Sequence, residues 1–226
     1  MNSKKFLRMT FLLALGFSIS NIGYAATYAG NGTPTEYLVT ISNVGFHKVG
    51  DATGTFITYA SGTGQYNIAS VSPGSNVGTL SATGSLSSGS YDQINFTVSK
   101  TMSLTGASNG VLSNGLPCRT TSGGTVISDP FGDGSVSAIY LGAADTGTPQ
   151  PETAVVPSGS GVTLPSGITD SGSTFQITMP ISFSVTNDAP NITVRFDVTN
   201  AIMFTAVTAF TCGVIPGPPT VTVSTV

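Results

Sequence analysis

Charged side chains are scarce in this chain, and basic side chains are scarcer than acidic ones. Only 8% of the 226 residues are charged, with seven Lys and Arg against ten Asp and Glu. Proteins that bind nucleic acid or anionic lipid need cations to neutralise phosphate groups. We therefore expect no nucleic-acid partner, and solubility must depend mainly on Ser, Thr, Asn and Gly.

Helical patterns and tryptophan are also missing. There is no Trp, and after the first 25 residues Leu, Ala, Glu and Lys do not recur at helical spacing. Thr, Val, Ile, Phe and Tyr instead recur at every second position, in runs that Gly, Ser and Asn clusters separate about every 8–12 residues. We expect an all-β fold, an antiparallel β-sandwich that forms a single domain with long Gly/Ser-rich loops.

The N-terminal residues have the pattern of a secretory signal peptide. Lys4, Lys5 and Arg8 precede an apolar stretch over 11–17, and small residues lead to Ala25. The stretch is too short to span a bilayer, and no later segment has the ~18 apolar residues of a membrane helix. We expect cleavage after Ala25, no transmembrane segment in the mature chain, and a secreted, periplasmic or cell-surface location. Cleavage leaves four basic residues against ten acidic ones, a net charge of −6.

Two cysteines remain after cleavage, Cys118 and Cys212. An exported chain meets an oxidising environment, and a pair of cysteines permits one disulfide. Closing a loop of about 95 residues stabilises a fold by about 4–5 kcal/mol in the chain-entropy treatment. Two free thiols or a metal site are the less favoured alternatives.

The clearest alternation lies near the C-terminal end. Apolar residues occupy every second position over 175–185 and again over 192–198. Residues suited to a turn, 187–190, separate the two runs, so we expect a hairpin over 174–199. Pro180 cannot donate a ladder hydrogen bond, which predicts an edge strand or a bulge there.

Other strands are shorter. Alternation over 37–41 resumes in the opposite phase over 44–46, which predicts a bulge near 42–43. The Gly, Ser, Thr and Pro content of about 106–172 predicts mostly long loops. Further short strands are expected at 56–59, 66–68, 77–80, 94–98, 136–141 and 202–212.

A Pro-rich hinge and a short alternating segment end the chain. Residues 216–219 contain three prolines and one glycine, and Val221, Val223 and Val226 follow among Thr and Ser. Such a strand can pair with its own sheet, which we favour, or add to the edge of a neighbouring copy and form head-to-tail filaments. The partner would then be the protein itself or another envelope or matrix component.

Catalytic patterns are weak. The only histidine, His47, ends a predicted strand, and no Gly-x-Ser-x-Gly turn leads into a predicted helix, so a Ser-His-Asp relay is disfavoured. We expect His47 to be solvated. The two glutamates, Glu36 and Glu152, and the eight scattered aspartates do not predict a catalytic carboxylate pair. We expect no enzymatic activity and no catalytic residues.

One segment has a spacing related to calcium loops. Asp129, Asp133 and Gly134 fit alternating oxygen ligands before a glycine. Phe131 stands at a ligand position and no Glu follows at the usual distance, so a plain Asp-Gly turn is favoured over calcium. No other cofactor is expected.

Two stretches resemble a known family. Residues 37–47, YLVTISNVGFH, form an alternating strand that ends in His, and residues 86–96, LSSGSYDQINF, contain a small-Gly-x-Tyr-x-x-Ile turn and strand. Both resemble a bacterial family of secreted, mostly uncharacterised domains with transthyretin-like or Cna-B-like β-sandwiches. The resemblance covers roughly residues 36–100 and implies a sandwich in the cell envelope. It implies no activity and no catalytic residues.

We therefore expect a signal peptide over 1–25, a β-sandwich domain over 26–213, and a hinge with a short strand over 214–226. The expected function is that of a non-enzymatic extracytoplasmic structural or surface-interaction protein, a component of the cell envelope or matrix. The alternative is a glycan- or calcium-binding β-sandwich module that uses the long middle loops.

Overall fold

The computed structural model describes residues 28–70, 82–123, 126–127, 139–155, 166–186, 192–217 and 219–225. Every regular element in these residues is a β-strand, and all pairings between the strands are antiparallel, so the predicted all-β fold class is confirmed. Within the same residues, no helix is long and apolar enough to cross a membrane.

The described residues form two seven-stranded sheets and one two-stranded sheet. In pairing order, the first sheet contains β1 (Tyr28–Gly32), β14 (Ile202–Ala206), β15 (Thr211–Pro216), β9 (Ile139–Ala144), β7 (Pro117–Arg119) and β6 (Ala107–Val111), with β8 (Val126–Ile127) also on β9. The second sheet contains β10 (Glu152–Val155), β5 (Thr101–Thr105), β2 (Glu36–Lys48), β4 (Gly89–Ser99), β12 (Thr174–Val185) and β11 (Ile168–Asp170), with β3 (Phe56–Asn67) also on β2. The two-stranded sheet pairs β13 (Ile192–Asp197) with β16 (Thr220–Thr225).

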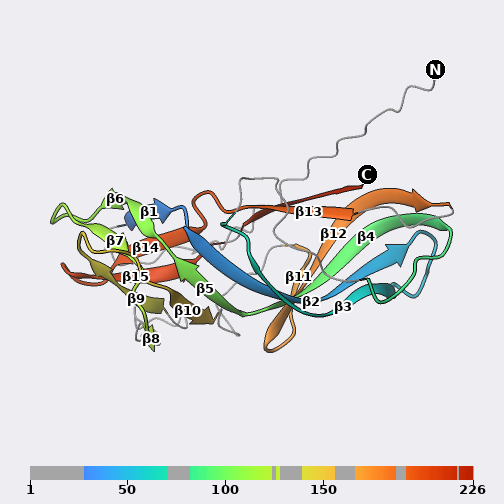
Figure 1. Ribbon diagram of the computed structural model, residues 1–226, viewed down its shortest axis with the longest axis horizontal. Helices are drawn as coiled ribbons and strands as arrows, with labels where there is room; N and C mark the ends of the chain where they lie inside the picture. Colours follow the sequence, from blue (N-terminus) through green and yellow to red (C-terminus); the bar gives the residue numbers. More distant parts are fainter. Residues whose placement is uncertain are drawn as a thin grey trace, which may run out of the picture.

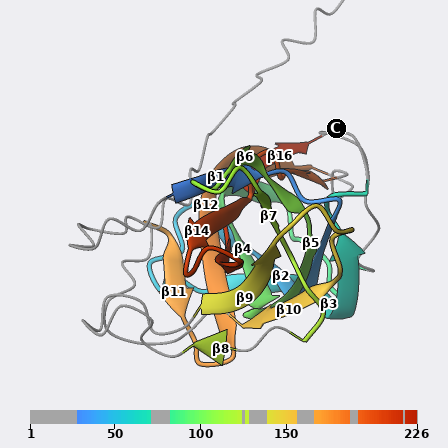
Figure 2. The same ribbon diagram turned by 90° about the vertical axis from the view of Figure 1, so that its left-hand side faces the viewer.

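The molecule is elongated, and the two large sheets lie mainly at opposite ends (Figure 1). The first sheet curls until its outer strands β1 and β6 lie side by side, as the end-on view shows (Figure 2). Their approach is so close that a Cβ built on Gly32 would lie 2.1 Å from the carbonyl oxygen of Ala107. Glycine at this position is therefore a condition for the curl.

Strand β2 connects the two ends of the molecule. Its pairing with β3 and with β4 shifts register between Ile41 and Asn43, which confirms the predicted bulge. Tyr37 and Ile41 before the bulge belong to one core cluster, and Phe46 after it belongs to a second cluster. Val44 contacts both clusters. The extra residue keeps the apolar side chains before and after the bulge on one face of the sheet.

The second core cluster is aromatic at its centre. The Phe46 ring packs edge-on against Phe183, with 5.5 Å between centroids, and against Tyr91 at 6.4 Å. Tyr91 and Phe183 stack at 5.1 Å. Edge-to-face and stacked arrangements at these distances are favourable beyond the area that they bury. The cluster thereby ties β2, β4 and β12 together.

The predicted hairpin over 174–199 is wrong in its pairing, although both strands exist. Strand β12 pairs with β4 and β11, and β13 pairs with β16 instead. The prediction for Pro180 is confirmed, because the β12–β4 register shifts between Pro180 and Phe183. Alternation predicts which residues form strands, but it does not decide which strands become neighbours.

Near the C-terminus, β14 pairs with β15 and β13 pairs with β16, and the two ladders follow one another. We call these four strands the C-terminal ribbon. The β14–β15 ladder ends at the pair Ile202–Pro216, and the β13–β16 ladder resumes at the pair Asp197–Thr220. Between them the amide of Gly217 donates to the Ala201 carbonyl at 2.7 Å. The tail thus pairs within its own chain, and Val221 is buried in the second cluster.

The middle of the chain contains more strands than the sequence predicted. The described parts of 106–172 include six short strands, β6 to β11, in addition to loops. The expected strands at 56–59 and 66–68 are two parts of β3, and the one at 136–141 corresponds to β9. The expected strand at 77–80 lies outside the described residues.

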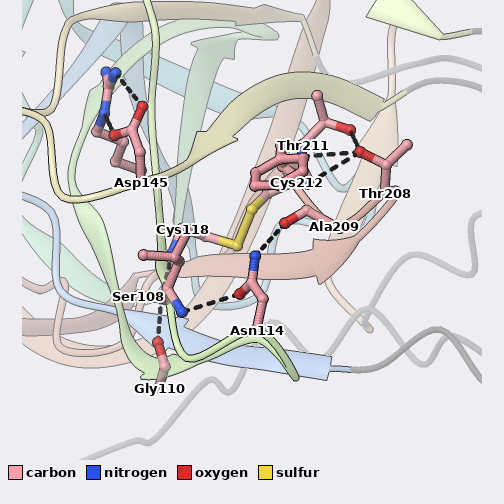
Figure 3. Close-up of a disulfide and its surroundings, with 12 residues drawn as sticks. Ser108, Gly110, Asn114, Cys118, Asp145, Thr208, Ala209, Thr211 and Cys212 are labelled. Atoms are coloured by element: carbon pink, nitrogen blue, oxygen red, sulfur yellow. Dashed lines mark hydrogen bonds and ion pairs between the residues drawn. A yellow bond between two sulfur atoms is a disulfide. The ribbon is translucent and has the colours of Figure 1, made fainter.

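The predicted disulfide is confirmed. Cys118 in β7 and Cys212 in β15 are joined with a Cα–Cα distance of 6.0 Å, and both residues are fully buried (Figure 3). Both strands pair with β9, so the disulfide crosses over this strand within the curled first sheet.

The disulfide should contribute a large part of the stability of the fold. We expect the double variant Cys118→Ala, Cys212→Ala to lose about 4–5 kcal/mol of unfolding free energy, because its unfolded chain is no longer looped. Urea unfolding of the mature protein measures this loss, with the wild type under reducing conditions as the matched control. Equal midpoints for oxidised and reduced wild type would contradict the prediction.

Strand β16 should stabilise its own molecule. Deleting residues 219–226 removes the burial of Val221 and the ladder to β13, and we expect the melting temperature to fall by about 5–10 °C without a change of oligomeric state. Calorimetry and size-exclusion chromatography measure the two quantities. Filaments that only the full-length chain forms would instead indicate pairing between copies.

Candidate functional site

The two stretches that carry the family resemblance are neighbouring strands. Phe46 pairs with Ile94, and His47 with Gln93, in the antiparallel β2–β4 ladder. The end of β2 and the start of β4 therefore meet at one end of the second sheet (Figure 1). This end carries the only histidine of the chain, and we treat it as the candidate site.

His47 is held through both ring nitrogens. Its Nδ1 lies 2.7 Å from Oδ1 of Asp92, and its Nε2 lies 3.1 Å from the carbonyl oxygen of Asp51. Both partners are acceptors, so the protonated ring, which donates from both nitrogens, satisfies both contacts. The side chain is only 12% exposed, so the expectation of a solvated histidine is wrong.

The electrostatics of the cluster favour charged His47. The pKa of His47 is raised, first by the hydrogen bond to Asp92 and further by Asp51. The pKa of Asp51 is lowered, mainly by hydrogen bonds that the side chain and amide of Thr53 donate. His47 and Asp92 therefore form an ion pair near the surface. Both ring nitrogens of His47 are hydrogen-bonded, so neither can activate a nucleophile in this arrangement.

The turn before β4 explains the second motif. Lys48 donates from Nζ to Oγ of Ser87 at 3.0 Å and to the carbonyl of Ser88 at 2.8 Å. Gly89 has φ +141°, and a Cβ there would lie 2.5 Å from Cε of Lys48. The Tyr91 hydroxyl donates to the Ser87 carbonyl at 2.8 Å. The Gly and the Tyr of the motif thus close the turn that supports His47 from the neighbouring strand.

The two glutamates do not form a pair. Glu36 lies opposite Thr105 and Glu152 lies opposite Leu104, so they flank the same strand β5 from its two sides. The offset of one residue places them on opposite faces of the sheet, because side chains alternate along a strand. Glu152 is buried with Leu104, while Glu36 is half-buried and accepts from Ser103.

Two basic side chains also form internal contacts. Lys100 is buried, contacts the carboxylate of Asp170, and lies 5.0 Å above the ring centroid of Phe175. Arg119 binds Asp145 with two hydrogen bonds, 2.5 Å from Nε and 3.0 Å from Nη2. Arg119 lowers the pKa of Asp145 by this bonding. These cations stabilise loops and strands rather than presenting charge to a ligand.

The calcium prediction concerns Asp129 and Asp133, which lie outside the described residues. Within the part of the chain that the structure describes, no group of three or more His, Cys, Asp or Glu side chains is arranged to hold a metal ion. Calcium binding at Asp129 and Asp133 stays a prediction.

Comparison with known families adds one result. A family model described as a domain of unknown function, DUF4382, matches residues 26–208. The chain belongs to the DUF4382 family. The match includes both motif strands β2 and β4 and most of the two sheets. It ends before Cys212 and β16, so the second half of the disulfide and the tail lie beyond it. No curated protein and no solved structure matches the chain significantly.

Sequence reasoning missed the partners of His47. Asp92 and Asp51 looked like two of many aspartates in turns, and only the β2–β4 register places Asp92 beside the imidazole. A signal was nevertheless present, because Asp92 directly follows Tyr91 of the small-Gly-x-Tyr-x-x-Ile motif. The pairing of the two motif strands converts two separate patterns into one site.

The His47 contacts should make stability depend on pH. The folded-state pKa is raised above the ordinary 6.5, so the stabilisation is complete below about pH 6.5 and is lost as the pH rises through the folded-state pKa. We expect the urea midpoint of the wild type to fall between pH 5.5 and pH 8.5, and that of His47→Gln to fall less. Asp92→Asn should resemble His47→Gln. Identical pH profiles for wild type and His47→Gln would contradict the assignment.

Proposed function

We propose that this DUF4382 chain is a non-enzymatic structural or surface-interaction protein outside the cytoplasm, a component of the cell envelope or matrix. The observation that carries the proposal is the bonding of His47. The one side chain with an ordinary pKa near neutral is used at both nitrogens to brace the ends of β2 and β4. A residue with this role holds strands in place.

The location is supported by two independent features. The first 25 residues have the basic, apolar and small-residue pattern of a signal peptide. The disulfide between Cys118 and Cys212 is typical of proteins that fold in an oxidising compartment outside the cytoplasm. Together they favour a secreted, periplasmic or cell-surface protein, and the resemblance to transthyretin-like or Cna-B-like envelope domains points the same way.

The rigid construction of the molecule supports a structural role. The disulfide and the internal ion pairs connect segments that are distant in sequence, and the C-terminal ribbon joins four strands near the end of the chain. For example, the Tyr37 hydroxyl of β2 donates to the carbonyl of Gly217, 180 residues away, at 2.9 Å. Strand β16, which contains Val221 and Val223, pairs with β13 of the same chain, so an assembly role for Val221, Val223 and Val226 would require β16 to leave β13.

A ligand screen tests the proposal against its alternative. We expect the melting temperature of the mature protein to stay within 1 °C, on the order of experimental scatter, across neutral glycans and calcium, because this role requires no small ligand. The variant Asp133→Ala is the control for calcium. A saturable, ligand-dependent rise in melting temperature would overturn the proposal in favour of a glycan- or calcium-binding module.

A further inference from the structure

Two hairpin tips meet at the end of the molecule that carries the first sheet. The tip between β6 and β7 spans residues 112–116, and the tip between β14 and β15 spans residues 207–210. Both lie at the left end of Figure 1. The side-chain amide of Asn114 in the first tip donates to the carbonyl of Ala209 in the second (Figure 3). The two tips therefore form one surface.

The backbone of this surface is held firmly. Oγ1 of Thr208 accepts from the amides of Phe210, at 3.2 Å, and Thr211, at 3.1 Å. The carbonyl of Phe210 accepts from the amide of Ala144 at 3.0 Å. Cys212, two residues further on, is fixed by the disulfide. The outward position of the Phe210 side chain is thus imposed by its surroundings.

Three apolar side chains in or next to the two hairpin tips are exposed to solvent instead of being buried in a core. Phe210 is 71% exposed, Val111 is 56% exposed and Val207 is 37% exposed. We call these three residues the apolar tip. Burying a Phe or Val side chain is favourable by about 1.5–3 kcal/mol, so a rigid loop that keeps them in water gives up stability. An exposed cluster of this kind indicates a contact surface.

The sequence around the apolar tip carries no charge. Residues 101–118 and 198–226 contain no Asp, Glu, Lys, Arg or His. The neighbouring Asp145, which Figure 3 also shows, is neutralised by its pairing with Arg119. A partner that binds this end therefore needs no charge of its own.

We infer that the apolar tip inserts into the interfacial region of an uncharged lipid bilayer. The inference rests on the proposed surface-interaction role and names the surface. A fluid interface accepts a protruding tip, and Phe is among the side chains that peripheral proteins bury at the boundary between lipid headgroups and acyl chains. A protein interface buries roughly 800 Å² per partner, whereas three side chains of this size offer at most about 400 Å². Anionic lipid is excluded as the preferred surface because the mature chain has a net charge of −6.

Flotation with phosphatidylcholine vesicles tests the inference on the full mature chain. We expect the wild type to float with the vesicles, and Phe210→Ser to reduce the partition coefficient about tenfold, because the largest inserting side chain is gone. Val49→Thr is the matched control. Val49 is 53% exposed but follows β2 in the other half of the molecule, so this variant should bind like the wild type. Equal melting temperatures for all three proteins exclude unfolding as the cause.

Four results would overturn the inference. The first is a wild type that does not float, and the second is Phe210→Ser floating as well as the wild type. The third is a dimer in sedimentation velocity that Phe210→Ser abolishes, which would assign the apolar tip to a second copy. Stronger flotation with phosphatidylglycerol vesicles would likewise contradict an uncharged contact. None of these results produces a ligand-dependent melting shift, so failure here is distinguishable from failure of the proposed function.

Discussion

The pairing of β2 with β4 is the constraint on which the rest of the structure depends. Through its bulge at residues 42–43, β2 places apolar side chains from both of its halves on one face, and the two core clusters meet at Val44. Strand β4 continues through Lys100 into β5, and β2 pairs with both of them. These strands form the middle of the second sheet, and β5 extends toward the first sheet (Figure 1). A one-residue slip would turn every core side chain to the other face. The two motif stretches, residues 37–47 and 86–96, meet at the end of this ladder, where Tyr91 and His47 form their hydrogen bonds.

Several of the few charged residues that the structure describes hold strands and loops together. Lys100 extends from the β4–β5 junction to Asp170 in the outer strand β11, and its ammonium group lies over the ring of Phe175. Arg119 holds the loop after β9 through Asp145 and the carbonyl of Thr148. Removing one partner of a buried pair leaves an uncompensated charge and is strongly destabilising. Such a protein can present uncharged areas of surface, and the apolar tip and the strands β14, β15 and β16, which contain no charged residue, belong to them.

Local sequence patterns predicted which residues form strands far better than they predicted which strands pair with one another. The alternation over β2, β4 and β12, the bulge in β2 and the irregularity at Pro180 all follow from a period of two and from proline chemistry. The hairpin over 174–199 failed because a turn-forming composition after β12 does not oblige the next strand to fold back onto it. Strand β13 pairs with β16 instead, and Phe196 in β13 packs against both core clusters. Apart from β9, the short strands between 107 and 170 carry too few large apolar residues for alternation to reveal them.

The sequence by itself determined the all-β class, because this class follows from composition and from the short-range alternation of apolar side chains. It also predicted the disulfide, because the chain has two cysteines and a signal-like N-terminus. Tertiary structure alone decided that Asp92 and Asp51 bind His47. It also decided that Glu36 and Glu152 lie on opposite faces of a sheet. Finally, it placed Asn114 in contact with the hairpin tip that exposes Phe210. Each of these is a contact between segments whose register is set by packing a core. No local preference encodes which strand becomes a neighbour, since that choice is made by the total apolar surface that the whole chain can bury.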